Sequence, residues 1–132
     1  MKNLLVNLRI IKNTLIILEN LINKEYICLL ESETDIKKLN LITEEKHFYL
    51  KKFIYLKKKQ SSLEEKYNIS PPYLKFFKMN NYWNWIFKKS LFLNKINLKN
   101  KILLNQKFYL NQRFLNILKS HRENLTFGIS EI

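Results

Sequence analysis

The feature that most constrains the fold of this chain is a heptad repeat of apolar residues in its C-terminal half. No Gly or Pro occurs between Tyr73 and Phe127. The members of this predicted seam are Tyr82, Ile86, Leu93, Ile96, Leu103, Leu110, Phe114 and Ile117, with Lys89, Asn100 and Lys107 interrupting it. A repeat kept over about five heptads predicts one long helix whose apolar stripe packs against other helices. At about 1.5 Å per residue this helix spans about 60 Å, more than a small domain covers, so part of the stripe is predicted to bind a partner.

Two further helical segments are predicted before this one. Three-four spacing predicts a first helix over residues 2–30, and its stripe comprises Leu4, Leu8, Ile11, Leu15, Leu18, Ile22, Tyr26 and Leu29. The polar residues 31–35 predict a turn with an N-cap, followed by a second helix over residues 35–60 in which Lys46 interrupts the apolar face. Ser70-Pro71-Pro72 predicts a break, after which the third helix covers residues 73–120.

These elements predict an all-α fold with a single helical domain over residues 1–122. The short connection between the first two helices favours an antiparallel hairpin, and the long third helix completes a coiled-coil-like three-helix bundle. Residues 123–132 lack periodicity and contain the only glycine, so they are predicted to form a flexible tail. The single cysteine, Cys28, is predicted to be a small buried residue of the first helix.

Charge is distributed unevenly along the chain. The 24 Lys and Arg residues exceed the 11 Asp and Glu residues, and residues 66–122 contain 12 basic residues and no acidic one. Such a balance commonly indicates a nucleic-acid partner or an anionic surface. However, only three of the basic residues are Arg, and a chain without Ala that is dominated by Lys, Asn and Ile is typical of an AT-biased coding sequence. We therefore interpret much of the charge as compositional drift, and the sequence argues against nucleic-acid binding.

The sequence offers no recognisable catalytic or metal site. With Gly128 as the only glycine there is no phosphate-binding loop, and His47 and His121 are isolated from each other and from Cys28. We predict a protein that is not an enzyme and needs no cofactor. The absence of a signal-peptide pattern, and of an apolar run of about 20 residues, predicts a cytoplasmic protein without a membrane span.

Two features of the third helix are predicted to be functional. Asn97 and Asn100 place two amides on one helical face, where they could fix register, be exposed, or contact a ligand. Between Phe108 and Leu118 the apolar face widens beyond one stripe, which suits ordinary packing or recognition of a partner helix in a groove.

Several motifs then resemble the flagellar export chaperones of the FlgN type. They are Asn97-x-x-Asn100, Leu103-Leu104, Asn111-Gln112, Leu115, Ile117-Leu118-Lys119 and Leu125-Thr126-Phe127-Gly128, with a weaker match at Ile42-Thr43-Glu44-Glu45-Lys46. The resemblance implies a cytoplasmic chaperone that holds the hook-filament junction proteins FlgK and FlgL before the type III export gate and ATPase components receive them. It also implies a client-binding region made of Leu103, Phe108, Leu110, Asn111, Phe114, Leu115, Ile117 and Leu118. Phe127 would act in handover to the export gate.

Two other functions stay open on the sequence alone. One is a basic coiled-coil scaffold or adaptor, and an uncovered seam could also close on a second copy to form a homodimer. The other is a Lys-rich helical nucleic-acid binder that uses the aromatic side chains of Tyr82, Trp83, Trp85 and Phe87.

Overall fold

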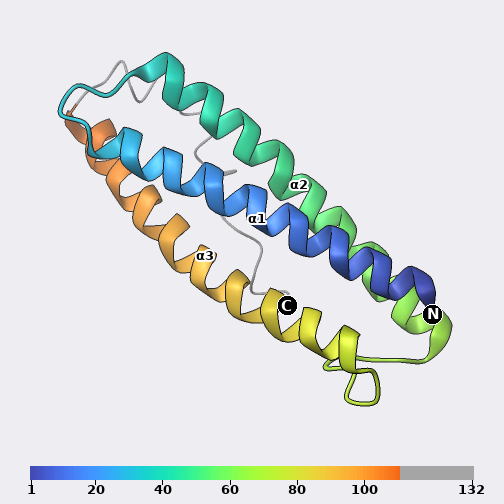
Figure 1. The fold of residues 1–132 in the computed structure, drawn as a ribbon. Coiled ribbons are helices and arrows are strands. Elements are labelled where there is room, and N and C mark those ends of the chain that lie inside the picture. Colours follow the sequence, from blue (N-terminus) through green and yellow to red (C-terminus); the bar gives the residue numbers. More distant parts are fainter. Residues whose placement is uncertain (111–132) are drawn as a thin grey trace.

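The part of the chain that the structure describes is a bundle of three long helices. The computed structural model describes residues 1–110, with side chains up to Lys107, and contains α1 (Lys2–Leu30), α2 (Ile36–Tyr67) and α3 (Phe77–Leu110). As Figure 1 shows, α2 runs antiparallel to α1 and α3 runs parallel to it. No strand occurs in these 110 residues, so the predicted all-α three-helix bundle is confirmed. The predicted continuation of the third helix to residue 120 and the predicted tail lie outside the described residues.

Helix α1 is the central helix of the bundle. It packs along its length against both α2 and α3, whereas α2 and α3 make few contacts with each other. Its buried positions form two adjacent stripes, which are Leu4, Leu8, Ile11, Leu15, Leu18, Ile22, Glu25 and Leu29 on one, and Asn7, Thr14, Leu21 and Cys28 on the other. A helix that contacts two neighbours needs such a wide face. Tyr26, predicted on the first stripe, is instead exposed, and Glu25 takes its place.

The helix ends follow from local chemistry. The Asp35 carboxylate accepts a hydrogen bond from the Lys38 backbone N–H at 3.1 Å, which caps α2. Helix α2 continues past its predicted end at residue 60, because Ser62 stays in the helix with its hydroxyl donating to the Lys58 carbonyl at 3.1 Å, and it ends at Asn68 in the left-handed conformation.

The third helix begins four residues later than predicted. Tyr73 has a φ of 59°, which is incompatible with a right-handed helix, and its backbone takes part in two successive turns with Ser70 and Phe76. This conformation turns the Tyr73 side chain into the core. The Asn80 side chain then donates to the Pro72 carbonyl at 2.7 Å and fastens the loop to the first turn of α3.

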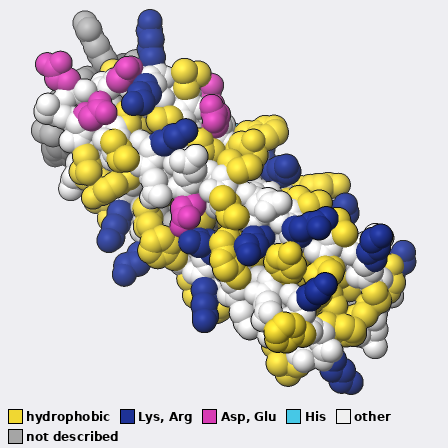
Figure 2. Space-filling model, viewed as in Figure 1, with side chains coloured by type: hydrophobic (Ala, Val, Ile, Leu, Met, Phe, Trp, Pro, Cys, Tyr) yellow, Lys and Arg dark blue, Asp and Glu magenta, His cyan; other side chains and the backbone are white. Residues whose placement is uncertain are grey.

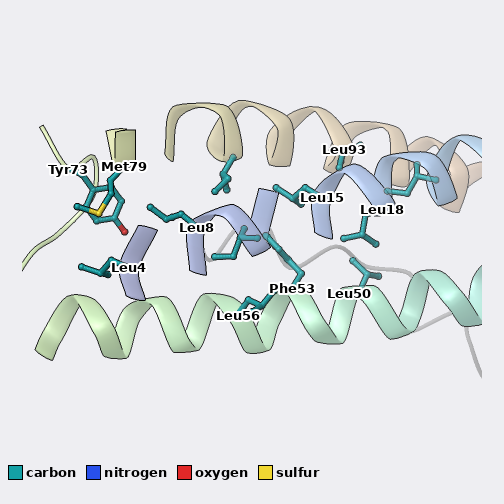
Figure 3. Close-up of a cluster of buried hydrophobic side chains, with 13 residues drawn as sticks. Leu4, Leu8, Leu15, Leu18, Leu50, Phe53, Leu56, Tyr73, Met79 and Leu93 are labelled. Atoms are coloured by element: carbon teal, nitrogen blue, oxygen red, sulfur yellow. The ribbon is translucent and has the colours of Figure 1, made fainter. Parts of the chain in front are cut away.

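Among the described residues, two apolar clusters form the core. The larger one fills the half of the bundle that holds the start of α1, and Figure 3 shows Leu8, Leu15, Phe53 and Leu93 converging in it from all three helices. The smaller one, near the α1–α2 turn, consists of Cys28, Leu29, Leu39, Ile42 and Leu104, with Ile36 and Leu103 packed against it. Cys28 is therefore a buried core residue, as predicted.

A chain of polar side chains closes the end of the bundle where α2 meets the loop. The Asn7 amide donates to the Leu56 carbonyl at 3.0 Å and to Gln60 Oε1 at 2.9 Å, and Gln60 Nε2 donates to the Tyr73 hydroxyl at 2.9 Å. The Tyr73 hydroxyl in turn donates to the Glu64 carboxylate. Burial raises the pKa of Glu64, and the hydrogen bond from Tyr73 opposes that rise.

Candidate protein-binding site

The side chains of α3 that face the core follow a different register from the predicted seam. They are Met79, Ile86, Ser90, Leu93, Asn97, Asn100 and Leu104, at heptad spacing. This row shares Ile86, Leu93 and Asn100 with the prediction, whereas Tyr82, Ile96 and Leu103 flank it and are only partly buried. Apolar periodicity selected the flanking positions because the true seam contains the polar residues Ser90 and Asn97.

Asn97 and Asn100 belong to a buried polar layer that joins the three helices. Lys46 of α2 donates to Glu25 Oε1 of α1 and to Asn97 Oδ1 of α3, at 2.8 Å each. The Asn100 amide donates to the same Glu25 oxygen at 2.8 Å and to the Ile22 carbonyl at 2.9 Å. The Thr43 hydroxyl completes the layer, 3.4 Å from Glu25 Oε2.

The polar layer lies between the two apolar clusters and holds a buried ion pair. The side chains of Glu25 and Lys46 are only 2% and 1% accessible to solvent. Burial lowers the pKa of Lys46, and the attraction of the Glu25 carboxylate opposes that shift. Sliding one helix past another would leave these charges unpaired in the core, so the geometry suits a role in fixing register.

This placement bears on what the two asparagines can contact. Asn97 and Asn100 are 2% and 1% exposed, so neither offers its amide to a peptide bound on the surface. Sequence reasoning noticed Asn97, Asn100 and Lys46 but missed Glu25. The sequence indicates that Glu25 faces the core only through its position on the apolar stripe, three residues after Ile22 and four before Leu29.

The structure places only part of the predicted client-binding region. Leu103 is half-buried against the smaller apolar cluster, so much of its surface is already used within the bundle. Phe108 and Leu110 belong to the last turn of α3. Asn111, Phe114, Leu115, Ile117, Leu118 and Phe127 lie beyond the described residues.

An exposed apolar row on α3 was not predicted. It consists of Leu91, Leu98 and Ile102, which are 50%, 46% and 57% exposed. Spacings of seven and four residues put them on one side of the helix, opposite the side of Leu93 and Asn100 that faces the core. The row, which we call the outer α3 row, leads towards the predicted client-binding region and gives α3 a second apolar face.

Residues 1–110 contain neither a group of metal ligands nor a membrane-spanning helix. Their His, Cys, Asp and Glu side chains form no group of three that could hold a metal ion. Over the same residues, none of the helices combines the length and the apolar content needed to cross a bilayer.

Comparison with known proteins gives two full-length relatives. Both carry the name "Putative flagella synthesis protein FlgN". One, from Buchnera aphidicola subsp. Schizaphis graminum (strain Sg), is 49% identical over 132 residues, and the other, from Buchnera aphidicola subsp. Acyrthosiphon pisum (strain APS), is 41% identical over 129 residues. Each alignment covers 98% of this chain and 96% of the relative.

Two other comparisons found nothing. No family model matches the chain. No solved structure matches it either. The identity to both relatives nevertheless extends over almost the whole of each chain, which shows that this protein belongs to the family of the flagella synthesis protein FlgN.

Proposed function

We propose that this protein is a cytoplasmic chaperone of flagellar export that binds the C-terminal helical regions of the hook-filament junction proteins FlgK and FlgL. Bound in this way, the clients cannot associate prematurely, and the chaperone delivers them to the type III export apparatus. The observation that carries the proposal is membership of the FlgN family over nearly the whole chain. The outer α3 row adds support, since a protein that holds an amphipathic client needs an exposed apolar surface.

The proposed mechanism is reversible burial of apolar surface without a catalytic step. An amphipathic client helix would lay its apolar face on the region from Leu103 to Leu118, as helices do in hydrophobic grooves. About 800 Å² covered on each partner is enough for a specific complex. Ordering a client terminus that is disordered when free reduces the net affinity, which allows release at the export gate, and Phe127 would act at that handover.

The test is a titration of the full chain with C-terminal peptides of FlgK and FlgL from the same genome, at low and moderate salt. The site variant is Leu115→Asp combined with Leu118→Asp. A matched control is Leu41→Asp combined with Tyr55→Asp, because these side chains belong to α2 and are 61% and 63% exposed. We expect the site variant to bind at least about tenfold more weakly, because a client would bury both leucines, and the control to bind like the unmodified protein.

A third variant tests whether the outer α3 row takes part in client binding together with the predicted region. Leu98→Asp combined with Ile102→Asp adds two charges to the row without touching residues 103–118. Weaker client binding in this variant would extend the site along α3, and unchanged binding would confine the site to the predicted region. Binding that is equal in all variants, or absent at both salt concentrations, would contradict the proposed function.

A further inference from the structure

A second surface lies at the other end of α3, where it packs beside the start of α1. A groove of about 780 Å³ opens between the two helices. Half-buried Leu5 and Val6 of α1 contribute apolar surface to it, and Tyr82 and Trp85 contribute aromatic surface from α3. A concave surface of this kind, with apolar and aromatic side chains, is the form that anchors a protruding side chain of a partner.

The groove is strongly basic. Lys2, Arg9, Lys12 and Lys78 contribute to its lining, and no acidic side chain does. In Figure 2 the acidic side chains of the visible face gather towards the end with the α1–α2 turn, whereas the charged side chains visible at the opposite end are all Lys or Arg. Charges of one sign around a groove favour a ligand of the opposite sign.

One of the four cations already interacts with the aromatic side chains. Lys12 Nζ lies 4.9 Å from the ring centroid of Trp85 and 5.6 Å from that of Tyr82. Both distances are within the range of a cation–π interaction. Because a lysine lies over these rings, they are poorly placed to stack on nucleobases, which is how a single-stranded nucleic acid would use them.

We propose that this groove binds an acidic amphipathic segment of another protein, with apolar side chains of the segment in the groove and its carboxylates on the surrounding cations. Charge complementarity identifies the occupant as acidic, and the apolar surface identifies it as a protein segment. On α3, the described lining of the groove ends at Trp85, before Leu103, where the proposed client-binding region begins. From Trp85 to Leu103 is 18 residues, or about 27 Å along the helix axis.

The test uses the full chain and three designed helical peptides. The first has Leu on one face and Glu beside it, the second replaces every Glu with Gln, and the third replaces every Leu with Ser. A single-stranded oligonucleotide serves as a fourth probe. We expect only the first peptide to bind well, with an affinity at least about tenfold higher than that of either other peptide, since it alone offers both apolar and carboxylate groups.

Two variants with the same change in net charge locate the binding. Arg9→Glu with Lys78→Glu changes the groove, and Lys51→Glu with Lys58→Glu changes exposed positions of α2. The groove variant should bind the first peptide at least about tenfold more weakly, and the α2 variant within about twofold of the unmodified protein. Circular dichroism confirms that both variants fold.

Three results would overturn the proposal. Equal losses in the two variants would mean that only net charge matters, and equal affinity for the Gln peptide would remove the role of the carboxylates. An oligonucleotide that binds more tightly than the first peptide, and loses affinity in the groove variant, would make the groove a nucleic-acid site. The Leu115→Asp, Leu118→Asp variant changes none of the described residues that line the groove, so a failure of the groove proposal is distinguishable from a failure of the chaperone proposal.

Discussion

Glu25 and Lys46 form an ion pair inside the bundle, between the two apolar clusters. Both side chains are almost fully buried, and each makes further hydrogen bonds to asparagines of α3. A buried pair of this kind adds little stability relative to apolar residues of the same size, but removing one partner leaves a charge without compensation. The pair therefore makes other alignments of the helices unfavourable.

The first prediction concerns this pair. Lys46→Met keeps an unbranched side chain, one heavy atom shorter, but leaves the Glu25 carboxylate buried without its cation, so the free energy of unfolding should fall by about 3 to 5 kcal/mol. Adding Glu25→Gln removes the unpaired charge and keeps an acceptor for Asn100, so the double variant should be more stable than Lys46→Met alone. Urea denaturation of the two single variants and the double variant measures this. Additive losses would show that the two side chains act independently.

The second prediction concerns the pH dependence of stability through Glu64. Its pKa in the folded protein is raised above the ordinary value of 4.5 by burial. Between 4.5 and the raised pKa the folded state holds a proton that the unfolded state has released, so this contribution to stability is complete below 4.5 and is lost as pH rises. Glu64→Gln cannot ionise, so its stability relative to the unmodified protein should increase with pH above 4.5.

Urea midpoints between pH 4 and 8 provide the measurement. Glu65→Gln, at the exposed neighbouring position, is the control because it removes the same charge. A pH effect shared by both variants would reflect net charge and not the burial of Glu64.

Only part of the polar layer could be predicted from sequence. Asn100 and Lys46 interrupt apolar patterns, and Asn97 lies three residues before Asn100 on the same helical face. A pattern shows neither which partner a polar residue contacts nor whether the residue is buried. The apolar pattern predicts that Tyr26 is buried and not its neighbour Glu25, since an aromatic residue fits an apolar stripe better than a carboxylate does. In the folded protein Glu25 can be buried because Lys46 supplies the opposite charge.

Helix α3 shows how a helix can be predicted while its register is not. The long interval without Gly or Pro was enough to predict the helix. The seam was assigned to the most apolar positions, but α3 has apolar residues on its flanks and on the outer α3 row as well. A helix that is apolar on several sides has no single stripe that periodicity can identify.

The third prediction tests the observed register of α3. Leu93 is completely buried, so Leu93→Ala should lower the free energy of unfolding by about 2 to 5 kcal/mol through lost burial and a cavity. Leu98 belongs to the outer α3 row, so Leu98→Ala should change it by no more than about 0.5 kcal/mol. Both substitutions remove the same atoms from the same helix. Equal losses in thermal or urea denaturation would contradict this register.

Of the two candidate apolar binding regions of α3, the sequence predicts residues 103–118 but not the outer α3 row. The resemblance pointed to residues 103–118, of which Leu103 is half-buried within the bundle. The outer α3 row escaped notice because Lys95 interrupts it and because it contains only three residues. Exposure of an apolar row depends on where the other helices pack, which the sequence of α3 alone does not contain.

The arrangement of the three described helices determines which parts of the bundle can open separately. Helix α1 contacts α2 on one side and α3 on the other, whereas α2 and α3 each depend mainly on α1. Opening α1 therefore disrupts both interfaces, but an end of α2 or α3 can open while the rest of the bundle persists. Local stability should differ accordingly along the chain.

The fourth prediction follows from this arrangement and is tested by native-state amide hydrogen exchange. Amides in the middle of α1, around Leu15 and Leu18, should exchange only through global unfolding, because both interfaces must separate before their hydrogen bonds are exposed. Amides in the last turn of α2, before Asn68, should exchange faster and depend less on urea, since the end of a helix can open without separating α1 from α3. If the middle of α1 exchanged as readily as that turn, the bundle would not be organised around α1. The Lys46→Met variant extends the test, because it should lower the free energy of global unfolding. Exchange in the middle of α1 should then accelerate by the factor that corresponds to that loss, whereas exchange at the end of α2, which opens locally, should stay nearly unchanged.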